Sequence, residues 1–341
     1  MTLVSTWFIL IAVLWTGFFI LEGFDLGVGM LHGVVGGDEA GRRAAINTIG
    51  PLWDGNEVWL VVAGAGMFAA FPGWYSTMFS GLYLALVVLL AALIVRGVSF
   101  EFRGKVDGQR WRQTWDWLLT GGSLFVPLLL GVGLGDLLAG LPIDSSQEYT
   151  GSFLDLLTPY GLFVGVTFVL LCLMHGGTFL ALKTTDHVRT RSLHLTRRIA
   201  PVTCVAVLVF AVWTQVTAGR GVLPNLLEVT AVLAVVAGAW LLAEGREGWA
   251  FAASTVAIAA SVSSIFTELY PRVMVSSTSS AFDLTVHNTA SGTYALKVMT
   301  VVAVILLPVV LAYQAWTYHV FRARVRPEDF APAVPAAAEP S

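Results

Sequence analysis

The sequence predicts an all-α polytopic membrane protein with about nine transmembrane helices. Composition, the repeated apolar segments and the positions of the basic residues all favour this fold class. Of the 341 residues, 56% are hydrophobic and only 12% are charged, and the mean hydropathy is +0.77. A soluble protein of this length carries roughly twice that charged fraction. The net charge of −3 is too small to indicate a nucleic-acid partner.

Nine apolar segments are long enough to cross about 30 Å of hydrocarbon as helices. The first, 7–31, is too long for a cleaved signal peptide, and it has no preceding basic residue and no small-residue cleavage site. The others follow at 51–71, 78–98, 117–138, 158–182, 199–218, 226–243, 249–269 and 294–321. Tryptophans near the segment ends fit an interfacial aromatic belt.

The orientation of these helices is predicted from Arg and Lys, which concentrate on the cytoplasmic side of membrane proteins. Basic residues lie between the first two segments, in 96–112, in 183–198 and in 322–326. With nine segments, all four regions fall on one side of the membrane. The opposite side receives the acidic loop 139–156. The N-terminus is therefore expected outside and the C-terminus in the cytoplasm.

The chain is expected to form one transmembrane domain, residues 1–326, followed by a disordered tail, residues 327–341, that is rich in Pro and Ala. His175 is the one histidine well inside a predicted helix, since His319 closes the last one, whereas a six-coordinate haem in a membrane usually needs two His, or His with Met. We therefore expect His175 to be a hydrogen-bonded packing residue. No Cys, His or acid spacing indicates a metal site, so this chain is expected to bind neither haem nor metal through its own side chains.

Four carboxylates stand in or beside the first two helices. Glu22 and Asp25 lie in "LEGFDLGVGML", and Asp54 and Glu57 lie in "WDGNEVWL". The three-residue spacing puts both acids of each pair on one helix face. Because the two helices are antiparallel and joined by a short loop, all four acids are expected at similar depth in the cytoplasmic half. A charge at mid-span costs roughly 2.5–3.5 kcal/mol on the insertion scale, so such residues usually pair or line a hydrated path. The four acids predict a proton-uptake path.

Structural alternatives exist for these acids. Asp54-x-x-Glu57 has the form of a capping box at a helix N-terminus, and Asp25 could extend to the cytoplasmic surface. Gly23 and Gly27 are spaced for a close helix contact, and no strand-turn-helix context supports a nucleotide loop.

Two other function classes also remain open, namely a proton-coupled secondary transporter and a purely structural membrane subunit. Transporters usually have broken helices around a mid-bilayer site, and no pair of interrupted segments stands out here.

Several motifs resemble signatures of subunit II of cytochrome bd-type quinol oxidases. They are "GFDLGVGML", "RRAAINTIGPLWDGNEVWL", "FAAFP", "WRQTWDWLL", "GSLFVPLLLGV", "VMVSST" and "LKVMT", in this order over nearly the whole chain. The resemblance implies an obligate heterodimer with a similarly folded subunit I in the bacterial plasma membrane. In that family subunit I holds two b-type haems, one d-type haem and the quinol site. The complex oxidises quinol on the outer face and reduces dioxygen to water with cytoplasmic protons.

The resemblance also implies roles for single residues, with no catalytic residue in this chain. Asp25 and Asp54 match family aspartates of a proton route. At the position of Glu57 the family also has Gln, so the resemblance does not imply an obligatory proton role for Glu57. At the position of Glu22 the family commonly has Asp, so the carboxylate is kept. Trp59 matches a position associated with oxygen access in some members, with packing against lipid or another helix as the alternative. The type of quinone, small accessory subunits and bound lipid stay open.

Overall fold

The computed structural model describes residues 2–219 and 221–330, which are mostly helical. The α-helices are α1 Leu3–Gly36, α2 Glu39–Asn47, α3 Trp53–Ala70, α4 Pro72–Gly81, α5 Tyr83–Phe102, α6 Gln109–Ala139, α7 Pro159–Lys183, α8 Asp186–Ala218, α9 Val222–Ala243, α10 Glu247–Leu269 and α11 Thr293–Val320. The shorter elements are η1 Phe153–Leu156, β1 Arg272–Met274, η2 Ser280–Phe282, β2 Leu284–Thr285 and η3 Pro327–Phe330.

All nine predicted segments coincide with helices, so the all-α membrane fold is confirmed. In the described part of the chain, eight helices are long and apolar enough to cross a membrane. The remaining predicted span is α3, whose first turn holds polar residues that lower its mean hydropathy. Two boundaries differ from the prediction. The segment 78–98 is divided between α4 and α5, and most of the arginine-rich segment 183–198 is the first part of α8 rather than a loop.

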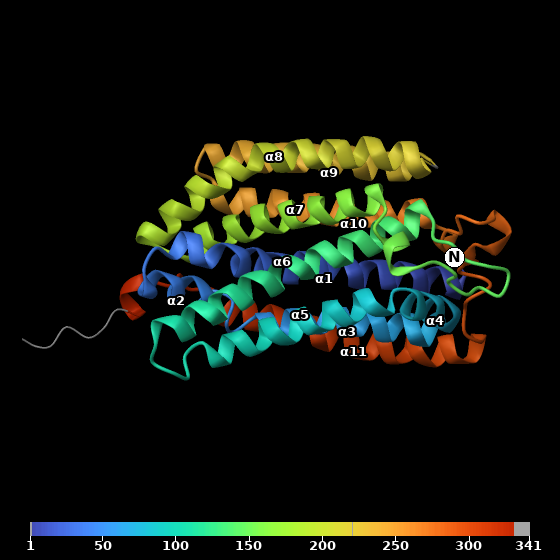
Figure 1. The fold of residues 1–341 in the computed structure, drawn as a ribbon, viewed down its shortest axis with the longest axis horizontal. Coiled ribbons are helices and arrows are strands. Elements are labelled where there is room, and N and C mark those ends of the chain that lie inside the picture. Colours follow the sequence, from blue (N-terminus) through green and yellow to red (C-terminus); the bar gives the residue numbers. More distant parts are fainter. Residues whose placement is uncertain (1, 220, 331–341) are drawn as a thin grey trace, which may run out of the picture.

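Helix α1 lies at the centre of the bundle, where it packs against α3, α6, α7 and α10 (Figure 1). Helices α8 and α9 cover one side, and α3, α5 and α11 lie on the other. The predicted close contact at Gly27 is confirmed. A Cβ added there would overlap the carbonyl oxygen of Cys172 and lie 2.8 Å from Cα of Gly176. Glycine therefore lets the backbones of α1 and α7 touch.

The two ends of the bundle differ in charge and structure. At one end the acidic segment 140–158 lies against the antiparallel β1–β2 hairpin, and Leu141 bridges to Ser276. The other end, which we call the arginine-rich end, holds α2 and the start of α8. There Lys183 Nζ donates to the carbonyl oxygens of Phe321 and Ala323, which ties the end of α11 to α7. Of the predicted tail, residues 327–330 form η3 beside α2, and 331–341 lie outside the described residues.

Candidate functional site

The structure brings three of the four predicted acids together near the arginine-rich end. Glu22 and Asp25 lie one turn apart on α1, and both are fully buried. Glu57 reaches the same place from α3 with its side chain 23% exposed. Asp54 is exposed, and no hydrogen bond or ion pair of its side chain is seen among the described residues. The acids are therefore neighbours, but in different surroundings.

One buried cation, Arg96 of α5, holds the acid cluster together. Its Nη1 lies 2.7 Å from Glu22 Oε1 and 3.2 Å from Glu57 Oε2, and its side chain is fully buried. The guanidinium carbon also lies 5.3 Å from the ring centre of Phe100 and 5.9 Å from that of Trp53. The distribution of basic residues predicted Arg96 at the membrane surface with the loop cations, and this prediction is wrong. Arg96 can stand inside the bundle because carboxylates from two other helices compensate its charge.

A second connection runs through the amide of Asn56. Its Nδ2 donates to Asp25 Oδ2 at 2.6 Å, and its Oδ1 accepts hydrogen bonds from Gln314 Nε2 at 3.0 Å and Tyr318 Oη at 2.9 Å. The indole Nε1 of Trp59 donates to Gln314 Oε1 at 2.8 Å. These side chains join α1, α3 and α11. Sequence reasoning missed Asn56, Gln314 and Tyr318, since neutral polar residues are not conspicuous until their partners are known.

The structural alternatives for the acids are contradicted. Helix α3 begins at Trp53 with Leu52 as its N-cap, and no side chain caps it. Asp54 therefore lies inside the first turn, and Glu57 is paired with Arg96 rather than with the N-cap amide. Asp25 does not extend to the surface, because it is fully buried. Helix capping therefore does not account for the placement of these acids.

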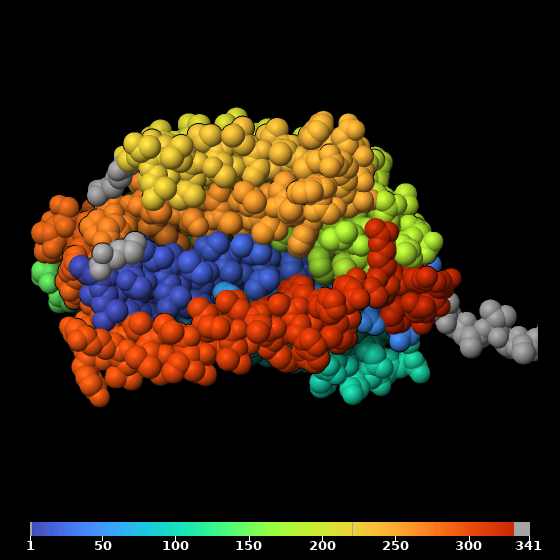
Figure 2. All heavy atoms as spheres, turned by 180° about the vertical axis from the view of Figure 1, so that it is seen from behind, coloured from blue at the N-terminus to red at the C-terminus, as the bar shows by residue number. Residues whose placement is uncertain are grey.

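Beside the site, a groove of about 800 Å³ separates α11 from α1 and α3. Asp54 and Tyr318 border the groove near the arginine-rich end, and Trp7 and Val298 border it toward the other end. Trp59 lines its wall. Figure 2 shows α11, in orange-red, running beside α1, in blue, on this face of the molecule. Within α11 Leu296 alone is buried, so this helix stands at the edge of the bundle.

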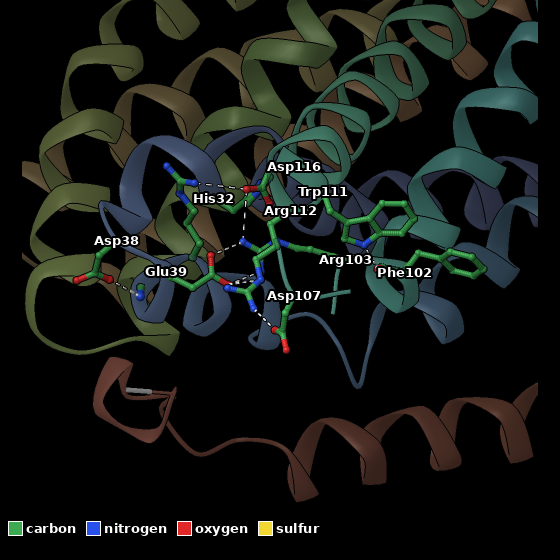
Figure 3. A network of polar contacts seen from close by, with 11 residues as sticks. His32, Asp38, Glu39, Phe102, Arg103, Asp107, Trp111, Arg112 and Asp116 are labelled. Carbon is green, nitrogen blue, oxygen red and sulfur yellow. Dashed lines mark hydrogen bonds and ion pairs between the residues drawn. The ribbon is translucent and has the colours of Figure 1, made fainter. Parts of the chain in front are cut away.

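A separate network fixes the arginine-rich ends of α1, α2 and α6 (Figure 3). Asp116 Oδ1 lies 2.5 Å from Arg103 Nε and 3.2 Å from His32 Nε2. Arg103 also binds the carboxylate of Glu39 through both terminal nitrogens, each at 2.9 Å. Partial burial disfavours the charged form of Arg103, but the bonds to Glu39 and Asp116 outweigh this effect and raise its pKa above the usual range. The network is a structural clamp.

The expectation for His175 is confirmed. Its Nδ1 lies 2.7 Å from Ser254 Oγ and its Nε2 lies 3.1 Å from the carbonyl oxygen of Ile20. The ring stacks on Phe251 with centroids 4.4 Å apart. Both ring nitrogens are thus occupied within the bundle. Among the described residues, no group of three or more His, Cys, Asp and Glu could hold a metal ion.

Comparison with known proteins decides the family. Residues 3–321 match the family model of cytochrome bd terminal oxidase subunit II. The chain belongs to this family. Subunit 2 of the Bacillus subtilis (strain 168) cytochrome bd ubiquinol oxidase is 46% identical over 323 residues, covering 94% of this chain and 96% of the relative. Subunit 2 of the Escherichia coli (strain K12) cytochrome bd-I ubiquinol oxidase is 36% identical over 360 residues, 95% of each chain.

A solved structure has the same fold. The bd oxidase from Geobacillus thermodenitrificans matches with a TM-score of 0.72 and 19% identity, over 93% of this chain and 98% of the other. The resemblance seen in the sequence motifs is therefore confirmed, and this subunit II is a multi-pass membrane component of an oxidoreductase complex. The transporter alternative is set aside.

Proposed function

We propose that this subunit II pairs with a haem-bearing subunit I in the bacterial plasma membrane and supplies part of the proton-uptake path for quinol-driven reduction of dioxygen. In this proposal two b-type haems, one d-type haem and the quinol site belong to the partner. The observation that carries the proposal is the buried acid cluster, Glu22, Asp25 and Glu57 around Arg96. Ionisable groups buried in a membrane protein usually serve a charge or proton pathway.

The exposure of the acids supports a direction for the path. Asp54 is exposed, Glu57 one turn further along α3 is partly exposed, and Glu22 and Asp25 are fully buried. We propose that the arginine-rich end is cytoplasmic, with the N-terminus outside and the C-terminus inside. Protons then enter near Asp54, pass Glu57 and reach the buried pair on α1. Arg96 contacts both Glu57 and Glu22, so the two helices meet at this point.

The surface formed by α3, α5 and α11 is our proposed docking face for subunit I. Exposed apolar side chains of this face include Val61, Phe68, Leu84, Leu90, Val304 and Val309. Glu57 and Arg96 of the cluster come from α3 and α5, two helices of this face. Helices α8 and α9 cover the opposite side, which we assign to lipid. A partner on the first face receives protons over the shortest distance.

The apolar groove bordered by Trp59 also supports the prediction that this residue lies on an oxygen route.

The test is quinol-driven oxygen consumption by the purified two-subunit complex carrying Asp25→Asn. Asparagine keeps the size and polarity of the side chain but cannot release a proton. We expect turnover to fall by about a hundredfold, the lower end of the range of general acid–base contributions, while the haem spectrum stays that of wild type. A normal rate with intact haems would show that protons take another path.

A further inference from the structure

Arg96 faces more carboxyl groups than it can neutralise. From α1 come Glu22 and Asp25, and from α3 comes Glu57. Of the other titratable groups beside the cluster, Asp54 comes from α3 and is exposed to water, Cys172 and His175 come from α7, and Tyr318 comes from α11. His175 is held by Ser254 and the carbonyl of Ile20. Within the described residues, the three acids have no ion pair with a second cation.

The charge count has a definite consequence. Three ionised carboxylates beside one guanidinium would leave a net charge of −2 inside the membrane. An uncompensated charge costs roughly 2.5–3.5 kcal/mol there even on the lenient scale, and an unpaired buried ion costs about 3–5 kcal/mol. The cluster is neutral only when one carboxylate is ionised and two carboxyl groups are protonated.

We propose that Arg96 is a positioning residue that sets the number of protons stored by the acid cluster at two. This inference deepens the proposed proton path and rests on it for its purpose. When the cluster gives one proton to the partner subunit, two carboxylates remain beside the guanidinium and the net charge is −1. A proton arriving by way of Asp54 and Glu57 restores neutrality.

Unfilled hydrogen-bonding positions support stored protons and water at this place. Glu22 Oε2 and Asp25 Oδ1 have no hydrogen-bond donor, and Arg96 Nε and Nη2 have no acceptor, in the described part of the chain. All three side chains are fully buried. Buried polar atoms are almost always hydrogen-bonded to protein or to ordered water. A carboxyl proton or a bridging water would satisfy each of these atoms.

The experiment measures protonated carboxyl groups by the infrared C=O band that shifts in D₂O, in complexes matched for haem content. Relative to wild type, Arg96→Gln should gain the intensity of one protonated carboxyl. Glu22→Gln should lose that of one, because Arg96 still balances one of the two remaining acids. The double variant E22Q/R96Q should match wild type, since two acids and no cation again need two protons. Arg96→Lys, which keeps the charge, should also match wild type.

Arg189→Gln is the matched control, because Arg189 pairs with Glu247 at the arginine-rich end and away from the cluster. Its spectrum gives the change that loss of an arginine causes by itself. If Arg96→Gln does not assemble, Glu22→Gln and the double variant still decide the question. Equal band intensity in those two variants would overturn the inference. The oxygen-consumption rate of Asp25→Asn tests the proton path separately, so the two ideas can fail independently.

Discussion

Gly27→Ala should weaken the contact between α1 and α7 and thereby disturb the acid cluster. The new methyl group would overlap the carbonyl oxygen of Cys172 and lie 2.8 Å from Cα of Gly176. Carbon atoms pack at about 3.5–4.0 Å, so the helices must separate by roughly 1 Å. Overpacking of this kind costs typically 1–3 kcal/mol. Asp25 lies on the same stretch of α1, within hydrogen-bonding distance of Asn56, so the shift also reaches the site.

The assay is thermal denaturation of the purified complex together with quinol-driven oxygen consumption. The matched control is Gly33→Ala on the same helix, where an added Cβ meets nothing within 4 Å. Alanine is the better helix former by about 0.5–1 kcal/mol, so the control should be as stable as wild type or slightly more so. If the Gly27→Ala complex has the same melting temperature as the Gly33→Ala complex, the close-contact reasoning is refuted.

Three further results are expected. Asp54→Asn should slow oxygen consumption less than Asp25→Asn, because Asp54 is exposed and water can reach the next acid without it; equal loss in both variants would mean that Asp54 is the sole entrance. His175→Ala should lower the thermal stability of the complex through loss of two polar contacts and a ring stack, and leave the reduced-minus-oxidised haem spectrum unchanged; selective loss of one haem band would contradict this. Cysteines placed at the exposed positions Ser145 and Thr190 should react with an impermeant thiol reagent from opposite sides of the membrane; labelling from one side only would contradict the proposed topology.

The helices could be predicted from the sequence because membrane crossing depends on local composition. An apolar stretch of about twenty residues must satisfy its own backbone hydrogen bonds, and a helix does so without reference to the rest of the fold. Glu22 and Asp25 could also be recognised from the sequence as candidate site residues, since a carboxylate in such an apolar stretch is unusual wherever it packs. The division of the third predicted segment into α4 and α5 could not be predicted, because the turn between them at Leu82 adds no charge and no proline.

The composition of the cluster could not be predicted because it depends on contacts between distant segments. Arg96 stands near the end of an apolar run, where arginine ordinarily marks the membrane surface. Its assignment to the interior requires Glu22 and Glu57, which lie 74 and 39 residues away (96 − 22 and 96 − 57). The sequence offered one signal for this contact, because Arg96 still lies within the apolar segment 78–98, two residues before its end.

Helix α11 links the acid cluster to the proposed docking face. The oxygen of the Asn56 amide accepts bonds from Gln314 and Tyr318, both on α11, which leaves its nitrogen to donate to Asp25. If α11 moved away, the amide oxygen would lose both of its donors, and nothing from α11 would then hold the amide with its nitrogen toward Asp25. Along most of its length α11 is separated from α1 and α3 by the groove. If the partner seats on α11 as proposed, it would also fix the donor to Asp25, and the proposed docking face and the proposed proton path would share these side chains.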